Sequence, residues 1–116
     1  MQSTISRGNI VLVKFPFTDQ TGALLRPALV VSDGQIGQDV ILSAISSTIR
    51  QEPTDYTIDT NHPEFILTKL NTKSTFRLHK LATVDRALIT RRLGHIGPSL
   101  QAEVNKILRR VVSGSE

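Results

Sequence analysis

The apolar residues in the first half of the chain come in short runs separated by turn residues. Three runs, at residues 9–15, 26–32 and 39–47, are nearly continuous in valine, isoleucine and leucine over the length of a strand. Runs of this kind indicate strands covered on both faces. The intervening residues 16–25 and 33–38 contain glycine, proline or aspartate, so we predict loops there.

The second half begins with weaker signals. An alternating pattern around Tyr56 predicts a short edge strand, and residues 74–84 predict a longer extended segment. Asp85 begins a short helical turn, after which residues 91–96 return as a strand.

The C-terminal segment changes to a helical period. Pro98 and Ser99 are suited to a helix start. The apolar positions that follow share the spacing of one helix face, and they are Leu100, Val104, Ile107, Leu108 and Val111. We therefore predict an amphipathic C-terminal helix.

Together these elements predict one mainly β domain with a terminal helix. The 116 residues are enough for one domain and contain no repeat or linker. Two arrangements satisfy the burial of both strand faces: a small closed or half-closed barrel, and a sheet with a helix across it.

Composition narrows the classes of function. Lysine and arginine total 14 against 10 acidic residues, for a net charge of +4, which favours a polyanionic partner such as nucleic acid. There are four phenylalanines, one tyrosine and no tryptophan, so contacts to backbone phosphates are favoured over base stacking. The absence of cysteine excludes disulfides and zinc–thiolate sites. No signal peptide or membrane span is visible, and we expect a soluble cytoplasmic protein.

Metal and cofactor chemistry find little support in the sequence. The three histidines lie far apart, and no HExxH motif, phosphate-binding glycine loop or GxSxG elbow is present. We expect neither a metal nor a cofactor.

Arg26 is the first candidate functional residue. It precedes Pro27, which favours an extended conformation, so it should lie at the mouth of a strand beside the loop of residues 16–25. A guanidinium there can hold a phosphate with two parallel hydrogen bonds. The alternative is a surface arginine paired with an acid.

Two further groups carry candidate chemistry. Ser46, Ser47 and Thr48 end the third strand, where their hydroxyls can donate to phosphate oxygens or serve as ordinary turn residues. In an extended strand, Arg77 and His79 share a face and Lys80 faces away. Arginine beside a titratable histidine forms a phosphate site capable of proton transfer. The alternative is a solvated strand face.

Three segments also resemble a known family. The run RGNIVLVKFPFTDQTGALLRPALVVS, residues 7–32, resembles the opening of MazF/PemK toxins, in which glycine follows a basic residue and an arginine–proline pair opens the second strand. DVILSAISS resembles the next strand, which ends in threonine or serine. LHKLATVD resembles the L-x-K-L-x-T-x-D pattern of PemK-like members.

This resemblance implies an SH3-like barrel of the CcdB/PemK type, formed by residues 1–116 as a homodimer. It implies a toxin of a type II toxin–antitoxin operon that cleaves single-stranded RNA without metal, through attack of the 2′-hydroxyl on the adjacent phosphate. It also implies a cognate antitoxin whose acidic tail folds over the active groove.

The resemblance carries over to individual residues. Arg26 matches the arginine of the arginine–proline pair, and Ser46 matches the hydroxyl residue that ends the third strand. His79 falls where some members have aspartate, and Ala82 where many have arginine. We predict Arg26, Ser46 and His79 as catalytic residues. The predicted RNA-binding residues are Ser47, Thr48, Arg77 and Lys80.

Two other functions remain open on the same fold. One is a non-enzymatic toxin like the gyrase poison CcdB, whose C-terminal aromatic this chain lacks, since it ends in RRVVSGSE. The other is a module that binds peptide or nucleic acid, such as a decayed family member.

Overall fold

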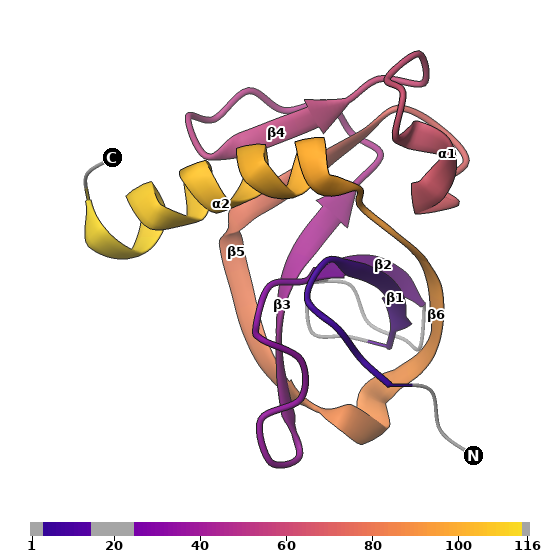
Figure 1. Cartoon of the computed structure of the whole chain (residues 1–116), viewed down its shortest axis with the longest axis vertical. Helices are drawn as coiled ribbons and strands as arrows, with labels where there is room; N and C mark the ends of the chain where they lie inside the picture. Colours follow the sequence, from indigo (N-terminus) through magenta and orange to yellow (C-terminus); the bar gives the residue numbers. More distant parts are fainter. Residues whose placement is uncertain (1–3, 15–24, 115–116) are drawn as a thin grey trace.

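The computed structural model describes residues 4–14 and 25–114. Six strands form one antiparallel sheet in the order β4-β5-β3-β2-β1-β6, and the sheet curls strongly while a long helix crosses it (Figure 1). The elements follow one another as β1 (Asn9–Val13), β2 (Arg26–Val30), β3 (Asp39–Ser46), β4 (Asp55–Ile58), α1 (Phe65–Thr68), β5 (Ser74–Asp85), the 3₁₀ turn η1 (Arg86–Leu88), β6 (Ile89–His95) and α2 (Pro98–Ser113).

The predicted fold class is confirmed: the chain is mainly β, with an amphipathic helix after Pro98. The edge strand around Tyr56 and the helical turn after Asp85 are also present. The sheet is not closed into a barrel, because within the described part of the chain β4 and β6 remain its two edges. The loop predicted at residues 16–25 lies outside the described residues, apart from Leu25.

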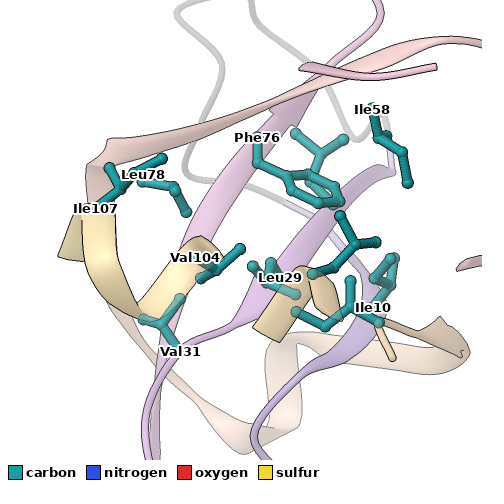
Figure 2. Packing of buried hydrophobic residues seen from close by; sticks show 11 residues of the cluster. Ile10, Leu29, Val31, Ile58, Phe76, Leu78, Val104 and Ile107 are labelled. Carbon is teal, nitrogen blue, oxygen red and sulfur yellow. The ribbon is translucent and has the colours of Figure 1, made fainter. Parts of the chain in front are cut away.

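The nearly continuous apolar runs are explained by two separate cores. On one face of the curled sheet, Ile10 and Leu29 pack beneath Val104 and Ile107 of α2 (Figure 2). A second buried cluster lies on the other side of the sheet and contains Val11 together with residues of the neighbouring strands. Because adjacent residues of a strand point to opposite faces, every position of such a strand must be apolar when both faces are covered.

Strand β5 contains a large bulge, in which residues 78–80 have no partner on β3. Ser43 and Ala44 are adjacent on β3, but their partners Leu81 and Arg77 lie four residues apart on β5. The fully buried Ser43 hydroxyl donates to the Arg77 carbonyl at 2.7 Å, which supplies that backbone acceptor with a partner. Bulges bend a strand and redirect its side chains. The side chains of residues 78–80 therefore do not alternate between the two faces of the sheet as those of a regular strand do.

The N-terminal cap of helix α2 is supplied by a residue that is distant in the sequence. Its N-cap residue, Gly97, has no side chain to accept the first amides. The Glu64 carboxylate instead accepts from the backbone amides of Ser99 and Leu100, both at 2.9 Å. A Cβ at Gly97 would stand 2.5 Å from the Glu64 carboxyl carbon, so glycine is what allows this close approach. A carboxylate is also favoured by the positive end of the helix dipole.

We expect Glu64→Ala to lower the free energy of unfolding by about 1 to 2 kcal/mol, because two amides and the helix dipole lose their acceptor. Urea denaturation followed by circular dichroism measures the loss. Glu103→Ala is the matched control, since Glu103 makes only a partly exposed 3.8 Å contact with Lys106. Equal stability of the Glu64→Ala variant and the control would contradict the role of this cap.

Candidate functional site

A large groove opens across the sheet, with a volume of about 1160 Å³. Its wall is built from β1, β2, β3, β5 and β6 together with residues 47–50 and 69–72. None of the described residues that line it is acidic. We call this the cationic groove because six of its lining residues are basic: Arg26, Arg50, Lys69, Arg77, Lys80 and Arg91.

Arg26 is the first residue of β2 and lies opposite Val13 of β1. Its side chain is exposed and lines the cationic groove beside Pro27. Within residues 4–14 and 25–114 it has neither a hydrogen-bond nor an ion-pair partner. The described chain therefore offers no acid to hold Arg26 in a surface ion pair.

The three predicted hydroxyl residues also line the groove. Ser46 ends β3, and its Oγ accepts from the backbone amide of Thr48 at 3.0 Å. A hydroxyl that accepts one hydrogen bond can still donate its own proton. The turn thus orients Ser46 while leaving its O–H to a ligand, and Ser47 and Thr48 lie exposed beside it.

Arg77 reaches the groove from β5 and is the only one of its cations with an acidic partner among the described residues. Its Nε donates to Oδ1 of Asp55 on β4 at 3.3 Å. Lys80 lines the same groove, although simple alternation predicts that it faces away from Arg77. That prediction is wrong because the bulge at residues 78–80 breaks the alternation.

His79 lies beside Arg77 but is not among the residues that line the groove. Its Nε2 is 3.2 Å from Nη2 of Arg77, and its Nδ1 is 2.6 Å from Oγ1 of Thr54. A neutral ring with its proton on Nδ1 satisfies both contacts, because arginine can only donate. The role of His79 in proton transfer stays a prediction.

Sequence reasoning missed Arg50, Lys69 and Arg91. Lys69 caps the short helix α1 in a left-handed conformation, with φ of 61°. Helix α1 packs so closely on β6 that a Cβ at Gly94 would lie 2.4 Å from the Leu67 carbonyl oxygen. No local pattern predicts this contact. Arg91 could have been found from the pairing of its strand, since it lies opposite Leu12 of β1 and both line the groove.

The tyrosine of β4 is not a proton acceptor for this site. Burial raises the pKa of Tyr56, and the nearby carboxylates of Glu103 and Glu64 raise it further. Its hydroxyl thus stays protonated well above neutral pH. Tyr56 packs instead against the core beneath α2 and does not line the groove.

The described residues contain no group of three or more histidine, aspartate or glutamate side chains placed to hold a metal ion. No helix among them is long and apolar enough to cross a membrane.

Comparison with known proteins places this chain in a family. A family model for PemK-like, MazF-like toxins of type II toxin–antitoxin systems matches residues 6–112. The chain belongs to the PemK-like, MazF-like toxin family. No curated protein matches it in sequence.

Solved structures share the fold of this PemK-like chain at low identity. MazF from Deinococcus radiodurans is 19% identical, with a TM-score of 0.73 over 97% of this chain and 99% of that one. A mycobacterial endoribonuclease bound to its cognate antitoxin is 19% identical, with a TM-score of 0.69 over 93% and 94% of the two chains. The Mycobacterium tuberculosis toxin MazF-mt6 is 16% identical, with a TM-score of 0.69 over 90% and 96%.

Proposed function

We propose that this PemK-like protein is a metal-independent endoribonuclease toxin that cleaves single-stranded RNA in the cationic groove. The observation that carries the proposal is that Arg26 and the oriented hydroxyl of Ser46 line the same groove. Arg26 has no partner in the described chain, and none of the described residues that line the groove is acidic. A positively charged concave surface attracts a polyanion and orients its phosphates. The mycobacterial structure of the same fold, which is named an endoribonuclease, supports the same reaction class.

The reaction uses the nucleophile that RNA itself carries. The 2′-oxygen attacks the adjacent phosphorus and the bond from phosphorus to the 5′-oxygen breaks, leaving a 2′,3′-cyclic phosphate and a 5′-hydroxyl. Arg26 neutralises the charge that develops on the phosphorane and contacts the departing 5′-oxygen, which takes its proton from solvent water. Ser46 donates to a non-bridging phosphate oxygen. Ser47, Thr48 and Lys80 hold the flanking backbone, and Arg77 binds a neighbouring phosphate.

His79 is the candidate acceptor of the 2′-hydroxyl proton. In the free protein its Nε2 faces an Arg77 N–H at 3.2 Å. Proton transfer therefore requires that Nε2 exchange this contact for the 2′-hydroxyl when RNA binds. Because the Arg77 N–H can only donate, it favours the tautomer that leaves Nε2 as an acceptor, and the Thr54 hydroxyl can then accept from Nδ1–H.

The same groove is suited to a protein inhibitor. An antitoxin with an acidic tail would compete with RNA for Arg26 and the other groove cations, because both ligands carry negative charge along an extended chain. The antitoxin in the mycobacterial complex of the same fold supports such a partner. We further propose that the toxin acts as a homodimer in the cytoplasm.

We expect Arg26→Ala to lower kcat/KM for a labelled RNA oligonucleotide by at least about a hundredfold, the usual loss when one group that stabilises transition-state charge is removed. Single-turnover cleavage assays measure it. Arg92→Ala is the matched control, since Arg92 is an exposed arginine of β6 that does not line the groove. Full activity of Arg26→Ala would remove this residue from the mechanism.

We expect cleavage to persist in excess EDTA and to stop when a single 2′-deoxy nucleotide replaces the ribonucleotide at the cut site, because the nucleophile is then missing. Gel analysis of end-labelled oligonucleotides checks both results. Cleavage of the 2′-deoxy substrate at the same bond would reject attack by the 2′-oxygen. A groove that binds RNA without cutting it would favour a binding module or a decayed toxin.

We expect His79→Gln to flatten the acidic limb of the pH profile of kcat/KM, because glutamine cannot take up the proton. His95→Gln is the control, as His95 is exposed on β6 and lies outside the groove. If the profile of His79→Gln follows that of the wild type, another group accepts the proton.

A further inference from the structure

Asp55 is a buried carboxylate that the proposed reaction leaves unused. Its side chain is only 1% exposed, and it is not among the residues that line the cationic groove. It lies on β4 directly opposite Arg77 in the pairing with β5. Burying a charged group is costly unless it is paired. We therefore expect the Asp55 carboxylate to have partners that offset the cost of its burial.

Both carboxylate oxygens of Asp55 are engaged. Oδ2 accepts from the backbone amide of Glu52 at 3.1 Å, which fixes the carboxylate within its own turn. Oδ1 accepts from Nε of Arg77 at 3.3 Å. The acid is thus anchored in its own turn through one oxygen, while its other oxygen accepts from the arginine.

Arg77 is held through two of its three nitrogens. Nε contacts Asp55, and Nη2 contacts His79, whose other nitrogen contacts Thr54. The described residues offer no hydrogen-bond acceptor to Nη1. The side chain is 13% exposed and lines the groove, so its unused donors are those left for a ligand.

We propose that Asp55 is a positioning residue, which fixes the Arg77 guanidinium through Nε so that Nη1 meets a phosphate of RNA bound in the cationic groove. Because Asp55 is buried, it acts on RNA only through its neighbours. These are Arg77, whose Nε it binds at 3.3 Å, and more weakly His79, whose Nδ1 lies 3.9 Å from the same Oδ1. Without the carboxylate, the half-buried guanidinium loses its acidic partner and takes up other orientations. Preorganisation of this kind lowers the entropy that the site loses when substrate binds. This inference rests on the proposed ribonuclease function.

A double-mutant cycle tests the proposal with the single variants Asp55→Ala and Arg77→Ala and the double variant. We expect Asp55→Ala to lower kcat/KM by about tenfold, and up to about a hundredfold, as displaced catalytic groups do. In the Arg77→Ala background the same change should cost much less, because Asp55 then retains only its 3.9 Å contact with the His79 ring. Additive losses in the double variant would overturn the proposal.

Two further variants separate positioning from general structure. Asp55→Asn keeps an oxygen that can accept from Nε, and we expect it to recover part of the activity lost in Asp55→Ala. Asp59→Ala is the matched control, because the Asp59 side chain is 53% exposed and makes only a 3.8 Å contact with Lys73 and a 3.4 Å hydrogen bond with its neighbour Thr60. Should Asp55→Ala fail to fold, Asp55→Leu, which has a similar volume and no acceptor, is taken through the cycle, and wild-type kcat/KM in that folded variant would overturn the proposal.

A readout that does not need activity distinguishes this inference from the proposed function. In nitrogen-15 NMR spectra of the free protein, we expect a resolved, slowly exchanging Arg77 Nε–H signal that is lost in Asp55→Ala and retained in Asp59→Ala. If this signal behaves as expected but the wild type cleaves no RNA, the ribonuclease proposal fails while the tether between Asp55 and Arg77 stands. If the wild type cleaves RNA and the signal is unchanged in Asp55→Ala, the positioning role is overturned.

Discussion

The central constraint on this protein is that β1, β2 and β3 are apolar on both faces. One face is buried within the curl of the sheet and the other beneath α2, so the helix is required to cover the sheet. The first amides of the helix in turn donate to the carboxylate of Glu64, the residue immediately before α1. Helix α1 then ends at Lys69, on the wall of the groove. Coverage of the sheet and construction of the site are thus linked through one short segment.

The cationic groove has the charge distribution of a binding site. Five of its six cations have no hydrogen-bond or ion-pair partner for their side chains among the described residues, so their mutual repulsion is not relieved by nearby acids there. A folded protein tolerates such local repulsion where a ligand of opposite charge relieves it. Arg77 differs from the other cations, because a fixed carboxylate holds it before any ligand arrives.

The sequence predicted those features that local patterns determine. The strands, the C-terminal helix, the exposed Arg26 at the start of β2 and the hydroxyls after β3 all follow from residue type and spacing. Contacts between distant segments did not follow. The position of Lys69 on the groove wall depends on the close packing of α1 against Gly94. The pairing of Asp55 with Arg77 depends on the register between β4 and β5. Strict alternation misplaced Lys80 because a bulge is a property of two strands rather than of one.

The bulge in β5 also has a consequence for how such a groove can diversify. The segments of β5 before and after residues 78–80 pair with β3 independently, and the three residues between them have no partner on that strand. A change in the length of this short stretch would alter which side chains face the cationic groove while both flanking ladders kept their registers. The scaffold thereby separates the part of the strand that maintains the fold from a part whose variation can select among ligands.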